Sequence, residues 1–447
     1  MTRDELMFGM RFLASQSDAM QGEGSPRFGF RRLGLNAGRR DYRYPEDAGM
    51  PLRGMPAVSA VIPVGLGDLE VLTGVSVEEE RKELAGDATE RLFSWARPLA
   101  QRYREAGLEP LLLADATVAS RDGRLLAWEL ALDGFRVVPR RPGTTLWEDI
   151  RLLCHADAYL VHPAAFPLAR TLTLRLLLQD LAGRVAARQA GASPQASSLA
   201  SFSGLRPEAL GRPGWPLLLT ARGLGACLAG GSAMGVEHVD TADDNAVFCA
   251  LPASPLDVEE RLERLGVLSS GEALRLLRLS GCPAKGVWHA MAVGRVAEAI
   301  ARKVQELGGK VDPDLCLAGG LVHDIAKGRK RHEAVGAIVL QGLGLPGLAR
   351  LVKDHSDVVL PAHKPVTERE LVYLADKYCY GPTFVPLQER FGQKLELFGS
   401  RPGARQGIER RLRHARELEA RLARELGESP EAMAAGVLGA RRDGEER

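Results

Sequence analysis

Histidines and aspartates that could bind a metal ion are spread along the last third of the chain. His323 and Asp324 are adjacent, His289 lies well before them and Asp376 well after. Neutral imidazoles and carboxylates suit a divalent transition metal such as Fe, Mn, Co or Zn. Adjacent side chains on a helix point about 100° apart, so His323 and Asp324 can both reach one ion in a crowded bundle. The four residues therefore predict a metal site assembled from separate helices.

The same residues resemble those of the HD-domain superfamily of metal-dependent phosphohydrolases. The likeness covers residues 270–425 and is carried by the segments CPAKGVWHAMAVGRVAEAIA (282–301), LAGGLVHDIAKG (317–328), HEAVGAIVLQGLGLP (332–346) and LVYLADKYCYGPTFVPLQERF (371–391). It implies an all-α HD bundle in which one divalent ion is held by His289, His323, Asp324 and Asp376. It also implies an enzyme that cleaves a phosphoester or phosphoanhydride with metal-activated water.

Two further histidines imply a second ion. His332 follows Asp324 by eight residues, and His355 lies in LVKDHSD, before the last carboxylate. In HD hydrolases that hold two metals, histidines at such places bind the second ion, and the aspartate of the pair bridges both. The resemblance thus implies one or two ions per chain, with Asp324 catalytic. It also implies a catalytic role for Lys327, which resembles the lysine that faces substrate phosphate in HD-I-G-K motifs, although Ala326 replaces the glycine.

Several polar residues near the motif have alternative interpretations. A lone histidine in a helical domain is usually a surface residue, and we expect this of His363 in the loop PAHKPV. His332 lies in the basic stretch GRKRHEAVGA, so a solvated side chain is the alternative to a ligand there. Lys377 and Arg390 either help to hold an anionic substrate or are simply exposed to water.

The composition is that of an ordinary globular protein. A length of 447 residues predicts two or three domains, and 45% hydrophobic and 26% charged residues are usual values. The net charge of +2 gives no strong signal for nucleic acid. Because the six cysteines are scattered singly, we expect neither disulfides nor a cysteine zinc site, and we expect Cys316 and Cys379 in the core. Without a signal peptide or a run of about 18 apolar residues, a cytoplasmic protein with no membrane span is expected.

The first half of the chain has an α/β pattern. Apolar runs predict strands at 58–64, 108–114, 135–139 and 157–163, and helical periodicity predicts helices at 88–106 and 124–133. Strands that alternate with helices imply a mostly parallel, Rossmann-like sheet. The small and polar segment 190–201 is expected to be an exposed loop.

The second half predicts helices throughout. Residues 252–268 look like a hinge, and apolar periodicity predicts helices at 287–307, 314–326, 333–343, 346–354, 367–379 and 404–426. We therefore expect four parts: an irregular extension at 1–55, an α/β domain at 56–253, an HD domain at 254–426, and a charged tail at 427–447 that is frayed from residue 430.

The α/β half resembles the nucleotidyltransferases that join CMP or GMP to molybdopterin. The strand order and the run HADAYLVHPAAFPLARTLTLRLLLQDL (155–181) carry the likeness. After the first strand, Gly65 and Gly67 remain, but the family's Ser-x-Arg-Met-Gly sequence, which cradles the triphosphate, is missing. The family's Pro-x-Asp-x-Pro is here Pro163-Ala164-Ala165-Phe166-Pro167, and its second acidic segment falls near 247–254, again without an acid.

Because nucleotidyl transfer needs Mg²⁺ on the triphosphate, these losses imply a degenerate domain. Asp240, Asp243 and Asp244 lie close by and could substitute as ligands, with turn or capping roles as the alternative. A domain of this kind would bind a nucleotide or pterin weakly, or serve as a docking surface.

Three functions follow as hypotheses. The first is an HD phosphohydrolase acting on a phosphorylated small molecule such as a nucleotide, regulated by the degenerate domain. The second is a molybdenum-cofactor nucleotidyltransferase with an accessory HD domain, which implies a molybdoenzyme-related protein partner. The third is a nucleotide sensor or scaffold without turnover.

Overall fold

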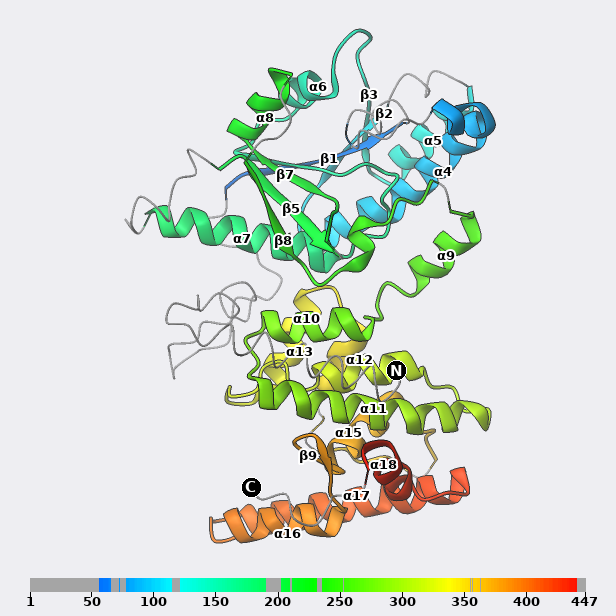
Figure 1. Cartoon of the computed structure of the whole chain (residues 1–447). Helices are drawn as coiled ribbons and strands as arrows, with labels where there is room; N and C mark the ends of the chain where they lie inside the picture. The colour runs from blue at the N-terminus through cyan, green and yellow to red at the C-terminus, as the bar shows by residue number, and fades with distance from the viewer. Residues whose placement is uncertain are drawn as a thin grey trace.

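The computed structural model describes residues 56–65, 72, 78–114, 121–189, 202–209, 211–230, 235–251, 253–353, 355, 357–361 and 363–439, with the backbone alone at 78–89, 121–123 and 187–189. The expected extension at 1–55, the loop at 190–201 and Gly67 lie outside these residues. Figure 1 shows two regions stacked on each other: an α/β region with a mixed sheet, and a helical region that begins at α10.

The α/β region is built on one sheet with the strand order β3-β2-β1-β4-β7-β5-β6 and with β8 beside β5. The strands are β1 Val58–Val64, β2 Pro110–Ala114, β3 Arg136–Pro139, β4 Ala158–Val161, β5 Gly204–Ala209, β6 Arg212–Pro213, β7 Leu217–Thr220 and β8 Val236–Asp240. The last five residues of β1 are buried, as its continuous apolar run predicts. The four strands predicted from apolar runs are all present, with ends shifted by up to two residues.

The sheet is less parallel than the sequence predicted. β1 to β4 are parallel, but β7 pairs antiparallel with both β4 and β5, and β6 pairs antiparallel with β5. A short turn joins β5 to β6 and can connect only antiparallel strands. The chain then continues into β7, which also runs against β5, and this reversal makes the sheet mixed here.

Helices cover both faces of this sheet (Figure 1). They are α4 Glu78–Glu105, α5 Arg121–Leu132, α6 Leu146–Leu153, α7 Thr171–Gln189 and α8 Ala221–Leu228, with the 3₁₀ helix η2 Asp244–Val247 after β8. α4, α5 and α7 belong to one core, and α6 and α8 to a second core on the opposite face. α4 begins ten residues before the start that the sequence predicted.

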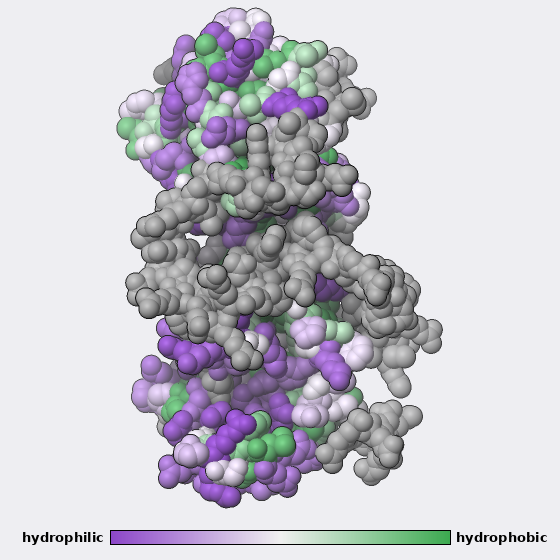
Figure 2. Space-filling model, turned by 90° about the vertical axis from the view of Figure 1, so that its left-hand side faces the viewer, coloured by the Kyte–Doolittle hydropathy of each residue, from purple (hydrophilic) through white to green (hydrophobic). Residues whose placement is uncertain are grey.

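Within the residues that the structure describes, the helical region contains every helix that its periodicity predicted, and three more. Its elements are α10 Ser270–Leu279, α11 Ala284–Glu306, α12 Pro313–Val322, α13 His332–Gly342, α14 Pro346–Val352, α15 Glu368–Lys377, β9 Cys379–Tyr380, β10 Thr383–Phe384, α16 Leu387–Phe398, α17 Ala404–Leu426 and α18 Pro430–Leu438. The expected hinge at 252–268 includes the short helix α9 Pro255–Glu263. On the face shown in Figure 2, hydrophilic side chains predominate over the visible part of this region.

The frayed tail predicted from residue 430 is wrong for the part that the structure describes. Ser429 accepts a hydrogen bond from the N–H of Ala432 and Pro430 occupies the first turn, so α18 has a well-formed start. Ala434 is buried, and α18 packs against α11 and α17. In α18, small apolar residues at helical spacing favour a helix despite the charged residues that follow it in the sequence.

A shared core joins the two regions. Leu172 and Leu176 of α7 and Ala242 belong to the same hydrophobic cluster as the helices around α11 and α12. Thr171 also contacts the turn between α13 and α14, where a Cβ added to Gly344 would lie 2.6 Å from the Thr171 Cβ. None of the helices in the described ranges is long and apolar enough to cross a membrane.

Candidate metal centre

Close helix packing brings the candidate ligands together. At the crossing of α11 and α12, a Cβ added to Gly320 would lie 2.5 Å from the Cα of Gly294. Only two glycines allow backbones to approach this closely, and the approach brings His289 on α11 beside His323 at the end of α12. α12 ends at Val322, four residues earlier than predicted, so the His323–Asp324 pair follows the helix instead of lying within it.

A first group of ligands gathers around His289 and His323. His289 Nε2 lies 3.1 Å from Asp376 Oδ1 and 3.9 Å from Asp324 Oδ2. His323 Nε2 lies 3.3 Å from Asp324 Oδ2 and 3.8 Å from Asp376 Oδ1. Ligands that share one ion through bonds of about 2.1 Å stand about 3–3.5 Å apart when neighbouring. These four residues therefore have spacings close to those of one first coordination shell.

A second group meets the other oxygen of the same aspartate. Asp324 Oδ1 lies 3.3 Å from His332 Nε2 and 3.7 Å from His355 Nε2. Gly328 (φ +91°) and Arg331 (φ +55°) turn the chain sharply between Asp324 and α13, which starts at His332. A non-glycine residue in the left-handed region is strained, and such strain is often found at functional sites. Asp324 thus presents one oxygen to each pair of histidines, as a bridging carboxylate would.

The ring orientations fit metal binding. The Nδ1 atoms of His289, His323 and His355 lie 3.4, 2.7 and 2.8 Å from the carbonyl oxygens of Gly381, Gly320 and Val352. A carbonyl can only accept, so each Nδ1 carries the hydrogen and each Nε2 keeps its lone pair for the centre. His323 Nε2 is fully buried, and no described residue forms a hydrogen bond with it. A buried nitrogen left in this state is what a metal ligand requires and what a packing residue normally avoids.

The electrostatics favour positive charge at the centre. Burial raises the pKa of the Asp324 carboxyl, but the imidazoles of His323, His332 and His355 outweigh it and hold that pKa well below the usual range. Burial likewise opposes ionisation of Asp376, whose pKa is nevertheless held well below normal by Lys377 and His289. Burial lowers the pKa of His323, yet the two carboxylates raise it overall because they stabilise a positive charge there.

The lysines predicted near phosphate both pair with carboxylates. Lys327 Nζ forms an ion pair with Asp324 Oδ2, and its side chain is 53% exposed, so it can reach a bound ligand from this position. Lys377 is buried, so the alternative of a solvated side chain does not apply: its Nζ lies 2.6 Å from Asp376 Oδ2 and donates to the His355 carbonyl.

His363 is exposed, as expected. Cys316 and Cys379 are fully buried in the core, also as expected.

In the α/β region, the segments 163–167 and 247–254, in which the sequence comparison with nucleotidyltransferases led us to look for acids, lie side by side. Ala165 is buried, and its carbonyl accepts a hydrogen bond of 2.8 Å from the N–H of Ala250. His162 closes the same loop: its Nε2 donates to the Phe166 carbonyl at 3.0 Å, and its Nδ1 accepts from the Tyr103 hydroxyl at 3.1 Å. Apolar contacts and backbone bonds thus hold the loop.

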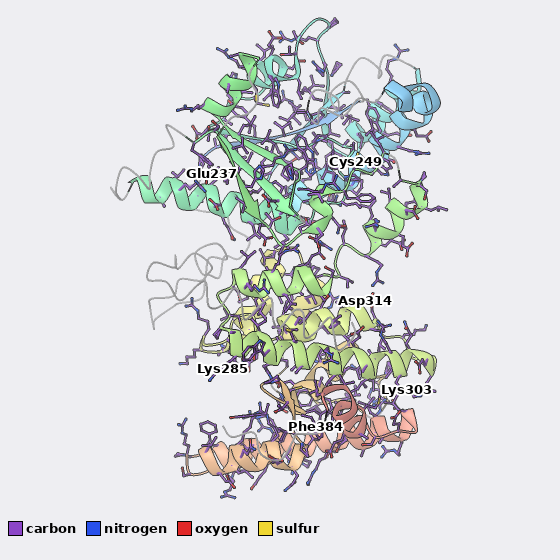
Figure 3. The ribbon with its side chains drawn as sticks, viewed as in Figure 1. Glu237, Cys249, Lys285, Lys303, Asp314 and Phe384 are labelled. Atoms are coloured by element: carbon purple, nitrogen blue, oxygen red, sulfur yellow. The ribbon has the colours of Figure 1, made fainter. Side chains whose placement is uncertain are left out.

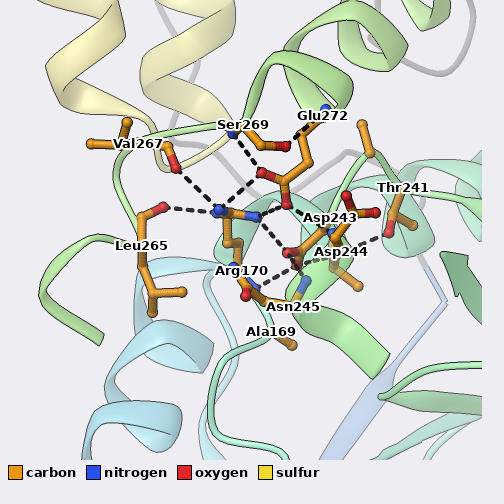
Figure 4. Close-up of polar contacts among 12 residues, drawn as sticks. Ala169, Arg170, Thr241, Asp243, Asp244, Asn245, Leu265, Val267, Ser269 and Glu272 are labelled. Carbon is orange, nitrogen blue, oxygen red and sulfur yellow. Dashed lines mark hydrogen bonds and ion pairs between the residues drawn. The ribbon is translucent and has the colours of Figure 1, made fainter. Parts of the chain in front are cut away.

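The nearby aspartates pair with arginines, which favours the structural alternative over a metal-binding role. Asp243 lies 2.6 Å from Arg170, accepts from the backbone N–H of the same residue, and caps η2 (Figure 4). Asp240 and Asp244 lie 3.3 and 2.5 Å from Arg275. Arg170 also binds Glu272 of α10 and the carbonyls of Leu265 and Val267, so this cluster ties the two regions together.

Comparisons with known proteins agree with the geometry of the helical region. A curated relative, an uncharacterized protein of Methanocaldococcus jannaschii, is 29% identical over 135 residues, which covers 26% of this chain and 79% of that protein. A family model described as "HD domain" matches residues 287–381, a span that includes all six candidate ligands. HD domains are generally metal-dependent hydrolases. The chain therefore contains an HD domain at residues 287–381.

Proposed function

We propose that this chain is a metal-dependent phosphohydrolase that cleaves a phosphoester or phosphoanhydride of a nucleotide-like substrate. The observation that carries the proposal is the set of Nε2 lone pairs that converge on Asp324, among them the buried and unpartnered Nε2 of His323. An arrangement in which one carboxylate serves two histidine pairs supports a centre for two ions. His289, His323, Asp324 and Asp376 would hold the first, and Asp324, His332 and His355 the second.

Divalent ions bound there would activate water and stabilise the negative charge that develops on the phosphoryl group. The protein supplies the rest. Carbonyl groups fix the imidazole rings, Asp324 holds the two histidine pairs in register, and the exposed side chain of Lys327 can turn toward a substrate phosphate. In the hydrolysis, the water oxygen forms a new bond to phosphorus, the bond to the leaving oxygen breaks, and that oxygen takes up a proton.

For the α/β region we propose a degenerate nucleotidyltransferase-like fold that regulates or targets the hydrolase. Its support is the replacement of both acidic segments by buried apolar ones that bond to each other, at Ala165 and Ala250. Asp240, Asp243 and Asp244 are engaged by arginines, so they are poorly placed to replace the missing acids. A buried alanine offers Mg²⁺ no side-chain oxygen.

The hydrolase proposal is tested with Asp324→Ala in the full chain, because this change removes ligands from both groups at once. Elemental analysis of freshly purified protein gives metal identity and stoichiometry, and phosphate release is measured from a panel of nucleotides and phosphomonoesters with added Mn²⁺, Fe²⁺, Co²⁺ or Zn²⁺. We expect the variant to lose metal and activity together. His363→Ala, at an exposed histidine outside the centre, is the matched control and should retain both. Phosphatase activity that survives in Asp324→Ala would contradict the proposal.

The competing proposal, a molybdenum-cofactor nucleotidyltransferase, makes a different prediction. It requires pyrophosphate release when the protein is incubated with CTP or GTP, Mg²⁺ and a pterin acceptor. We expect none, because no acid stands at Ala165 or within residues 247–254. Tight nucleotide binding without release of phosphate under any metal would instead favour a sensor.

A further inference from the structure

Two half-buried cations lie one helical turn apart on α16 without an acidic partner. Arg390 and Lys394 are at positions i and i+4, which share a helix face. Within the ranges that the structure describes, no carboxylate forms an ion pair with either side chain. Arg390 Nε is buried and has no hydrogen-bond partner, and the guanidinium stacks 5.1 Å from the centre of the Tyr380 ring. Lys394 Nζ lies over the ring of Phe391, 5.4 Å from its centre.

This pair lies beside the metal centre. Tyr380, which Arg390 covers, precedes Gly381, whose carbonyl lies 3.4 Å from His289 Nδ1. Lys394 is close enough to Lys377 and Asp376 for their charges to act on it. In Figure 3, Phe384 of the same β9–β10 hairpin lies between α11 and the α16–α17 pair. The hairpin thus connects the histidine end of the centre with the cationic face of α16.

The charges at this place are not balanced. Lys377 is already neutralised by Asp376, and Arg411, the other cation that acts on Lys394, donates to the carbonyl of Gly407. Burial and the neighbouring cations lower the pKa of the Lys394 ammonium to about 8, which leaves it mostly protonated at neutral pH. Cations withdrawn from water are normally paired, so two without a partner indicate a place for an anion.

We propose that Arg390 and Lys394 form a subsite for a second phosphate group of the substrate, beside the phosphoryl group that reacts at the Asp324 centre. A guanidinium can bind phosphate with two parallel hydrogen bonds, and an ammonium adds a point charge. The inference rests on the proposed phosphohydrolase function and narrows its substrate class. The substrate carries at least two phosphate groups, and a simple monoester occupies only part of the site.

The test compares the full-length, metal-loaded protein with a variant carrying Arg390→Met and Lys394→Met together. Methionine keeps the apolar stems that pack on Tyr380 and Phe391, so the fold is preserved. Calorimetry measures binding of adenosine mono-, di- and triphosphate. In the unmodified protein we expect the addition of the second or of the third phosphate group to tighten binding about tenfold or more. This affinity step should be absent from the double variant. Metal content should not change.

Arg401→Met is the matched control, because Arg401 stacks on Phe398 just beyond the end of α16 and is exposed. It should retain the affinity step. The subsite is refuted if the series shows no step in the unmodified protein, or the same step in the double variant. Hydrolysis of p-nitrophenyl phosphate, which has one phosphate, is measured in parallel. Its absence from the unmodified protein would count against the proposed function, while the binding series would still decide on the subsite.

Discussion

Two clusters of buried charge, one at the junction of the regions and one in the HD domain, differ in how completely their polar atoms are satisfied. Around Arg170, the guanidinium meets Asp243 and Glu272 and two carbonyl oxygens, and both carboxylates accept further backbone bonds (Figure 4). Around Asp324, histidine lone pairs converge, and the Nε2 of His323 has no hydrogen-bond partner among the residues that the structure describes. The first cluster is complete without a ligand, whereas the second is arranged to receive a cation.

The largest effect should come from His323→Leu, which removes the unpartnered nitrogen. We expect metal content and phosphate release to fall to background. In contrast, the free energy of unfolding of the metal-free protein should fall by only about 1 kcal/mol, because the variant loses a single hydrogen bond, from Nδ1 to the Gly320 carbonyl, and Nε2 made none. Denaturation of chelator-treated protein together with elemental analysis measures both. A variant that kept its metal would remove the distinction between the two clusters.

Arg170→Met should show the opposite pattern. It leaves Asp243 and Glu272 buried without their counter-charge, and breaking a buried ion pair from one side costs about 3–5 kcal/mol. Metal stoichiometry should be unchanged in the fraction that folds. Urea titration of both variants measures the free energy of unfolding. The control is Arg302→Met, which removes an exposed i,i+4 pair with Glu298 and should lower that free energy by less than about 0.5 kcal/mol. Equal losses in the two variants would show that the junction cluster is no more than a surface pair.

Gly320→Ala tests whether helix packing sets the ligand geometry. The new Cβ would overlap the Cα of Gly294, so α11 and α12 must separate, at about 1–3 kcal/mol. Because His289 and His323 lie on these two helices, metal affinity should fall as well. Gly225→Ala in α8, where a Cβ meets nothing within 4 Å, should leave both properties intact. Unchanged metal affinity in Gly320→Ala would place the origin of the geometry elsewhere.

The smallest and most gradual expected effect is the dependence of stability on pH that arises from His162. Burial lowers its pKa from 6.5 to about 3, because the charged imidazolium is poorly solvated between Tyr103 and Phe166. The unfolded chain therefore binds a proton that the folded chain refuses between pH 6.5 and about 3. Stability should fall as the pH falls through this window, by about 1.4 kcal/mol per unit from this group. Urea titrations at pH 7, 6 and 5 should show a shallower loss in His162→Gln, and parallel curves would contradict the assignment.

Most helices of the helical region could be predicted because their periodicity is local. Apolar residues at helical spacing marked α11 to α15 and α17. The end of α12 was placed too late, since the apolar pattern continues past Val322 and does not mark the turn that leads through Gly328 and Arg331 to α13. The antiparallel strands β5 to β7 were missed for a related reason: they are short, and partners elsewhere in the sheet determine them. The charges beyond residue 430 concealed α18 in the same way, because packing against α11 is a tertiary property.

By itself, the sequence determined the type and order of the candidate ligands, since imidazoles and carboxylates next to apolar helices already imply metal chemistry. Only the tertiary structure decided that each oxygen of Asp324 faces a different pair of histidines and that Lys377 is buried against Asp376. It alone also showed that no carboxylate in the described part of the chain pairs with Arg390 or Lys394. These facts concern distances between segments far apart in the chain. Such distances depend on helix crossings such as that of Gly294 and Gly320, and no local pattern encodes them.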